Sequence, residues 1–219
     1  MDIETQSLPQ QRTLEIVNKC RKEMMGKEKW VFDRTVGDIT LESKAFPECN
    51  IRGYRCSVNT SKTPAQLMDA VWNPTKTDSN GNVMKMESAM KLLDPSIESW
   101  NIIENSETSR IVRMVTVVPG FKWLFWPRET IIVQEKIFEN NGDQWFVTYS
   151  TNHPKFPTSS KYVRTTVHWN CFGFCANANQ TTTINKITLV SPNGYMPPGI
   201  VEYFSGKMVD MTNHLRSNE

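Results

Sequence analysis

The chain has 219 residues, of which 38% are hydrophobic, and this is enough material for one domain with a sizeable core. Lys and Arg number 25 against 23 Asp and Glu, so the formal net charge is +2. A charge this close to zero argues against the strongly basic face that is typical of nucleic-acid-binding proteins. We therefore expect a single domain over residues 1–219 that does not bind nucleic acid.

The sequence carries no signal of a secreted or membrane-spanning protein. No apolar run approaches the roughly 20 residues needed to cross a bilayer. Residues 1–10 are polar and lack the apolar centre of a signal peptide. The five cysteines are odd in number and irregularly spaced, which favours reduced thiols over a disulfide framework. These features predict a protein of the cytoplasm.

Cys171 and Cys175 have a spacing that could suggest a metal site. No second cysteine pair accompanies them, and the surrounding residues have the pattern of a strand. A structural zinc ion takes four ligands. We therefore expect no metal site and no cofactor.

Turn and capping signals divide the first half of the chain. Gly26 is a plausible helix stop, and Thr63-Pro64 is typical of an N-cap followed by proline in the first helical turn. Asp94-Pro95 ends a run of good helix formers. The expected elements are a helix over 11–25, strands over 30–35, 39–45 and 51–59, and helices over 64–72 and 83–93.

The second half is dominated by strands. The segment 140–143 is the strongest hairpin turn, and Pro197-Pro198 opens a last helix. The expected elements are strands over 100–104, 110–118, 129–139, 144–151, 163–172 and 181–190, and a helix over 197–216. This order predicts an α+β fold in which nine antiparallel strands form one curved sheet around the C-terminal helix.

The last helix carries an apolar stripe with spacings of four, four, three and four residues: Ile200, Phe204, Met208, Met211 and Leu215. An ordinary amphipathic helix packed on a core has the same pattern. Methionines on adjacent turns also suit a lid over a cavity, because Met adapts to variable shapes. We take Ile200, Phe204, Met208 and Met211 as candidate ligand-binding residues.

The connection 119–127 contains four consecutive apolar residues: Trp123, Leu124, Phe125 and Trp126. Four such neighbours in an irregular loop cannot all point into one core, and exposed aromatic side chains mark interaction surfaces. Aromatic residues also favour the bilayer interface, and the flanking Lys122 and Arg128 suit anionic head groups. The alternative is a loop folded back to fill the open end of the sheet.

Two charged residues lie on otherwise apolar strands. Arg113 alternates with apolar residues in one strand, and Glu135 does so in the next. If the two strands pair across a loop centred near Trp123, Arg113 and Glu135 become neighbours. Such a pair facing a dry cavity could bind a lipid hydroxyl or phosphate. A paired charge on the solvent side of the sheet is the alternative.

The sequence shows no catalytic motif. The three histidines, His153, His168 and His214, are scattered, and no HExxH, GxSxG or P-loop pattern occurs. The cysteines have no obvious histidine or asparagine partner along the chain. We therefore expect a protein that is not an enzyme.

Several short motifs occur in a characteristic order. Pro127-Arg128-Glu129 opens a strand, His153-Pro154 is followed by Pro157, and Val163-Arg164 opens the next strand. The segments 193–197 and 209–216 complete the series. In this order and spacing the motifs resemble those of the START (StAR-related lipid-transfer) family, over roughly residues 14–216.

The resemblance implies a helix-grip fold and a nonenzymatic carrier that holds one lipid between the sheet and the C-terminal helix. Its gating loop corresponds to Trp123–Trp126 here. Glu129 replaces the usual aspartate. Sterol-carrying members have a cavity arginine at the position that Gln134 occupies, so the resemblance makes Gln134 a candidate ligand contact and leaves sterol specificity open. Gln134 and Glu135 should face opposite sides of the sheet.

Three functions remain open at this point. The first is a monomeric shuttle that takes one phospholipid or sterol and visits membranes transiently. The second is a module that senses a lipid, or serves as a scaffold, without delivering it. The third is an enzyme on the same fold, which needs a titratable group inside the cavity.

Overall fold

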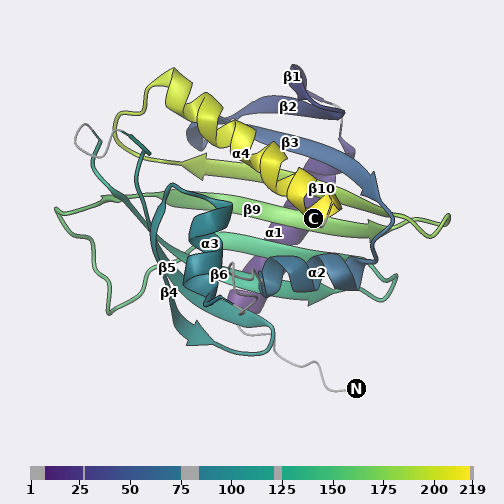
Figure 1. Cartoon of the computed structure of the whole chain (residues 1–219), viewed down its shortest axis with the longest axis horizontal. Helices are drawn as coiled ribbons and strands as arrows, with labels where there is room; N and C mark the ends of the chain where they lie inside the picture. Colours follow the sequence, from purple (N-terminus) through teal and green to yellow (C-terminus); the bar gives the residue numbers. More distant parts are fainter. Residues whose placement is uncertain (1–7, 27, 75–83, 121–124, 218–219) are drawn as a thin grey trace.

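The computed structural model describes residues 8–26, 28–74, 84–120 and 125–217, which form one large sheet with helices on both faces (Figure 1). The helices are α1 (Leu8–Met25), α2 (Pro64–Trp72), α3 (Met86–Leu93) and α4 (Pro198–Ser217). The strands are β1 (Val31–Val36), β2 (Ile39–Phe46), β3 (Cys49–Thr60), β4 (Ile97–Asn105), β5 (Ser109–Thr116), β6 (Arg128–Phe138), β7 (Gln144–Ser150), β8 (Val163–Arg164), β9 (Thr166–Ala176) and β10 (Thr182–Ser191).

The sheet confirms the predicted α+β architecture. Nine strands follow the order β1-β2-β3-β10-β9-β7-β6-β5-β4, and every neighbouring pair is antiparallel. The short β8 is a tenth strand that pairs in parallel with the start of β6. The sequence predicted one strand over 163–172, but Val163 and Arg164 pair with β6 while β9 starts at Thr166.

Helices cover the two faces of the sheet unequally. Helix α1 packs on β7, β9 and β10, and Figure 1 shows it behind the sheet, while α2, α3 and α4 lie in front. We call these the α1 face and the α4 face. Because helices cover both faces of its centre, eight consecutive residues of β6 are buried, from Arg128 to Glu135.

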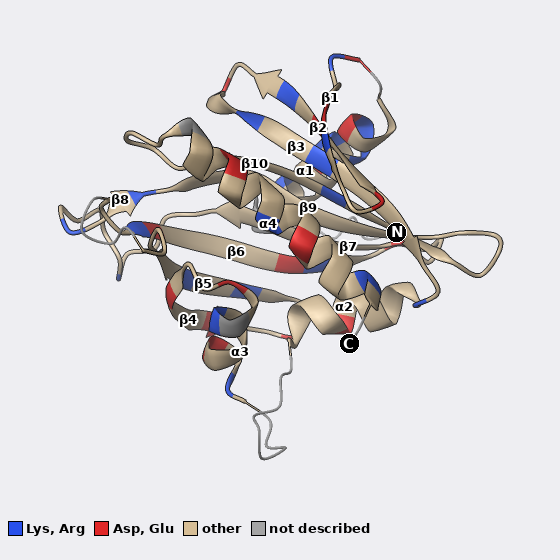
Figure 2. Ribbon diagram, turned by 45° about the horizontal axis from the view of Figure 1, so that its top comes forward, with Lys and Arg blue, Asp and Glu red and all other residues tan. Residues whose placement is uncertain are grey.

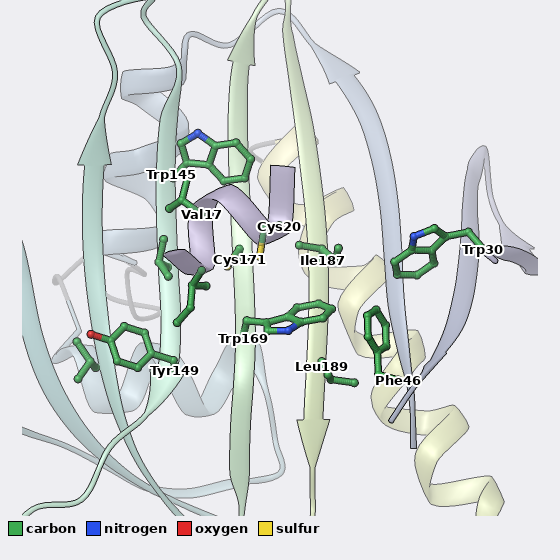
Figure 3. Packing of buried hydrophobic residues seen from close by; sticks show 13 residues of the cluster. Val17, Cys20, Trp30, Phe46, Trp145, Tyr149, Trp169, Cys171, Ile187 and Leu189 are labelled. Carbon is green, nitrogen blue, oxygen red and sulfur yellow. Dashed lines mark hydrogen bonds between the residues drawn. The ribbon is translucent and has the colours of Figure 1, made fainter. Parts of the chain in front are cut away.

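The core under α1 is rich in aromatic residues. Val17 and Cys20 of α1 point toward the strands, where Trp145, Tyr149 and Trp169 pack around them (Figure 3). Trp145 lies directly opposite Gly173 on β9, and a Cβ atom at Gly173 would come within 2.8 Å of its ring. Glycine therefore makes room for the indole. Buried side chains therefore fill the space between α1 and the sheet.

The helix boundaries agree with the sequence signals to within a few residues. Thr63 caps α2 as predicted, and its side chain and that of Gln66 form a capping box. Helix α1 begins at Leu8, three residues before the predicted start, and α3 begins at Met86, three residues after. Helix α4 spans nearly the predicted range and lies along the α4 face of the sheet.

Candidate functional site

A cavity of about 860 Å³ lies between the α4 face of the sheet and the helices α2, α3 and α4. Its walls are largely apolar. Helix α4 contributes Phe204, Met208, Met211 and Leu215, and the strands contribute Trp100, Met114, Ile132, Phe146 and Phe172. This volume falls in the range of roughly 300–1,000 Å³ that is usual for small-molecule sites.

Helix α4 supplies three of its four predicted ligand contacts to this wall. Phe204, Met208 and Met211 line the cavity, and Met208 also packs on Ile39 of β2. Ile200 does not line it. Ile200 lies in the first turn of α4, one turn before Phe204, beyond the end of the cavity, so its predicted position there is corrected.

A row of polar residues crosses the floor of the cavity. The strand registers place five residues directly opposite one another on β5, β6, β7, β9 and β10: Arg110, Gln134, Thr148, Asn170 and Thr188. All five line the cavity. Residues that are opposite in neighbouring strands have Cβ atoms about 5 Å apart, so the row is continuous. The cavity therefore has a polar band between apolar walls.

Arg110 is held firmly at one end of this row. Its Nε donates to Gln134 Oε1 at 2.7 Å, and its Nη1 donates to the backbone oxygen of Trp72 at 2.9 Å. The guanidinium also lies over the Trp72 ring, with 4.2 Å from Cζ to the centroid. Only 3% of Arg110 is exposed, and this burial lowers its pKa to about 10. Gln134 thus faces the cavity, as the resemblance implies, and orients an arginine.

Lys186 lies beside the other end of the row, two residues before Thr188 on β10. Its Nζ donates to Asn170 Oδ1 at 2.5 Å and sits 3.8 Å from the centroid of the Phe172 ring. Burial of the side chain lowers the pKa of Lys186 to about 8. Sequence analysis missed both Arg110 and Lys186. Alternation marks each as a cation on an apolar strand, but only the strand register tells which face it occupies.

The predicted pair of Arg113 and Glu135 does not form. Arg113 lies opposite Ile131, four residues before Glu135, and Glu135 lies opposite Ser109. Both side chains are on the α1 face, and neither lines the cavity. The observed register is centred on residue 122, whereas pairing Arg113 with Glu135 requires a centre at residue 124, one residue beyond Trp123. A two-residue error in the centre shifts the pairing by four.

Each of these two charges has another partner. Arg113 Nε donates to Glu129 Oε1 at 2.7 Å, and Arg164 pairs with the other oxygen of Glu129 at 2.9 Å. Glu135 accepts hydrogen bonds from Thr13 of α1 and from Ser109. These contacts link β5, β6, β8 and α1, so both residues stabilise the sheet and the prediction that they bind a ligand is corrected.

The family model of the START domain matches residues 14–218. The chain belongs to the START domain family. Human StAR-related lipid transfer protein 5 has the same fold, with a TM-score of 0.75, 17% identity and coverage of 96% of both chains. Human STARD10 (TM-score 0.68, 15% identity, 91% of this chain and 76% of that one) is also similar. No curated protein sequence matches the chain.

A bacterial structure extends this likeness. The STAR-related lipid transfer protein of Xanthomonas axonopodis has a TM-score of 0.65 and 12% identity, with coverage of 87% of this chain and 98% of that one. Identities this low show a shared START fold and say nothing about a shared ligand.

The loop before β6 is only partly described. Trp123 and Leu124 lie outside the described residues; Phe125 is half-buried, and Trp126 is 62% exposed. Arg128 ties the end of this loop to the entry of α4, because its Nη1 donates to the Trp126 oxygen at 2.8 Å and its Nη2 to the Tyr195 oxygen at 3.0 Å. One side chain of this START domain therefore connects the loop before β6 to the segment that leads into α4.

The histidines do not form a cluster in this START domain. His153 Nε2 is 3.0 Å from Glu104 Oε1, and His168 Nε2 is 2.9 Å from Ser191 Oγ, both away from the cavity. His214 of α4 lines the cavity. Within residues 8–26, 28–74, 84–120 and 125–217, no three His, Cys, Asp or Glu side chains gather as metal ligands would.

The surface charge is mixed. Figure 2 shows acidic and basic residues scattered over the ribbon, with neither sign gathered on a single element. In the part of the chain that the structure describes, no helix combines the length and apolarity needed to span a bilayer.

Proposed function

We propose that this START domain binds one lipid, a phospholipid or a sterol, in the cavity beneath α4 and carries it between membranes without catalysing a reaction. The cavity of about 860 Å³, with apolar walls and a polar band, is the observation that carries the proposal. Burial of apolar ligand surface contributes about 25 cal/mol per Å² before ordering costs. The polar band would then orient the head of the lipid.

Membership of the START family supports the lipid as the ligand class. The similar structures from human and Xanthomonas axonopodis are named lipid transfer proteins. We propose further that the protein acts as a monomer in the cytoplasm.

The exchange route we propose runs between the loop 119–127 and the start of α4. The exposed indole of Trp126 would enter the membrane interface, where aromatic rings are favoured. Arg128 contacts both the end of this loop and the segment before α4, so a movement of the loop would displace the start of α4. A lipid could then pass from bilayer to cavity without crossing water.

A vesicle-to-vesicle transfer assay tests this function. Donor vesicles would carry a fluorescent phospholipid or sterol with a quencher, and the protein should raise the rate of dequenching in proportion to its concentration. Saturable binding with no transfer would instead indicate a lipid-sensing module. Neither binding nor transfer of any lipid would reject the proposal.

A further inference from the structure

The floor of the cavity contains two buried cations. Arg110 and Lys186 are 3% and 4% exposed; Arg110 ends the polar row on β5, and Lys186 lies beside its other end on β10. Among the described residues, no carboxylate oxygen lies within 4.0 Å of either group. Arg110 is nevertheless well satisfied by Gln134 and the Trp72 carbonyl. Lys186 is the cation that lacks sufficient partners.

Lys186 makes one hydrogen bond where an ammonium group can donate three. Its acceptor is Asn170 Oδ1, and its other close neighbour is the face of the Phe172 ring. Lysine is almost never fully buried without a partner, because removing its charge from water is costly. A partner supplied by the ligand would offset this cost.

Thr148 supplies a second, independent sign of a missing ligand group. Its Oγ1 is buried, lines the cavity and has no hydrogen-bond partner in the structure. Thr148 lies directly opposite Asn170, the residue that holds Lys186. A buried hydroxyl without a partner loses its hydrogen bonds to water and gains none in return, so such groups normally have partners. The ammonium and the hydroxyl therefore lie on either side of Asn170.

The acidic residues of the cavity are on its rim. Asp69 of α2 and Asp210 of α4 are exposed, and Asp94 after α3 accepts a hydrogen bond from the backbone of Ser96. The floor is thus cationic and the rim carries the acidic groups. This arrangement disfavours a positively charged head on the floor.

We infer that the cavity binds a lipid with an anionic oxygen head, a carboxylate or a phosphate, whose oxygens accept hydrogen bonds from Lys186 Nζ and Thr148 Oγ1. This inference rests on the proposed lipid-binding function and narrows it to a ligand class. The head supplies the hydrogen-bond acceptors that the floor lacks. The hydrocarbon chain of the lipid lies along the apolar wall that α4 forms. No covalent step is involved.

Matched ligand pairs test the inference on the unaltered protein. Calorimetric titration would compare oleate with oleyl alcohol and oleoyl lysophosphatidate with monoolein, all below their aggregation concentrations. The chains are the same within each pair, so the ratio of affinities reports the charge of the head. We expect the anionic member of at least one pair to bind at least about tenfold more tightly, as a charge-assisted hydrogen bond requires. The pair that shows the difference identifies a carboxylate or a phosphate.

Substitutions then locate the effect. Lys186→Met should remove the preference for the anionic member, and Lys186→Arg should retain part of it. Lys207→Met is the matched control, because Lys207 lines the same cavity from α4 but pairs with Asp210 at 3.6 Å. It should change the preference less than about threefold.

The outcomes separate this inference from the function on which it rests. Equal affinity within both pairs would overturn the anionic head, and a preference that survives Lys186→Met would overturn its binding by Lys186. Either result would leave a lipid-binding cavity. Failure of all four ligands and of neutral phospholipid and cholesterol to bind would overturn both.

Discussion

Arg110 of β5 and Gln134 of β6 lie directly opposite each other, and Arg110 Nε donates a hydrogen bond of 2.7 Å to Gln134 Oε1 inside the cavity. The contact places a fixed cation where the resemblance to sterol carriers implied only an isolated polar residue. The row of opposed residues continues from Gln134 to Thr148 and Asn170, and Asn170 accepts a hydrogen bond from Lys186.

Removing Gln134 should destabilise the fold. Gln134→Leu leaves the buried Arg110 Nε without its acceptor, and we expect a loss of about 1–3 kcal/mol in the free energy of unfolding, measured with urea. In the double variant with Arg110→Leu the loss should be smaller than the sum of the two single losses, because neither polar partner is then stranded. Strictly additive losses would contradict the contact.

Lys186 should make stability depend on pH in a defined direction. Its pKa is about 8 in the fold against 10.5 for the free side chain, so the unfolded chain binds more protons between these values. The penalty for burying the charge is complete below pH 8 and disappears as pH rises toward 10.5. Lys186→Met should therefore be more stable than the parent protein at pH 7, and this advantage should shrink by about 2–3 kcal/mol at pH 10.

The thiols around Lys186 do not produce the pH dependence of the stability difference between the two proteins. Cys56 lies opposite it on β3, and Cys20 and Cys171 lie near it. Burial raises the pKa of Cys56, and the hydrogen bond with Cys171, together with burial, raises that of Cys20. The difference between the two proteins, measured by urea unfolding at each pH, isolates Lys186. A difference that stays constant from pH 7 to pH 10 would count against a charged, buried Lys186.

Two methionines of α4 should respond differently to truncation. Met208 is 6% exposed and packs on β2, whereas Met211 is 36% exposed, although both line the cavity. Met208→Ala should cost about 2–4 kcal/mol in stability and Met211→Ala less than about 1 kcal/mol. Thermal unfolding checks this. Equal losses would mean that α4 is not anchored through Met208.

The exposed indole of Trp126 should matter for transfer and little for folding. Trp126→Ser should slow vesicle-to-vesicle transfer severalfold while changing stability by less than about 0.5 kcal/mol. Phe138→Ser is the matched control, because Phe138 is 56% exposed at the opposite end of β6. An equal effect of both substitutions, or none, would reject the role of the loop at the membrane.

The elements of this fold could be predicted because their signals are local. Thr63 and Gln66 form the expected capping box, and the segment 140–143 connects β6 and β7 as expected. The stripe on α4 needed only helical periodicity, which placed Phe204, Met208 and Met211 on one wall.

Predicting the site required the register between neighbouring strands, which the local sequence of each strand does not determine. The long connection between β5 and β6 does not determine which residues pair, and a shift of four residues led to Arg113 and Glu135 instead of Arg110 and Gln134. Lys186 was not predicted as a site residue, because an isolated lysine in a strand usually faces solvent. Its burial follows from the position of β10 between β3 and β9, under α4.

Native mass spectrometry of the purified protein, with extraction and identification of any bound lipid, tests the central claim most directly. We expect one lipid per chain, lost on denaturation and recovered in a saturable titration, with a carboxylate or phosphate head. A protein that has no lipid bound and takes up none at saturating concentrations would contradict it.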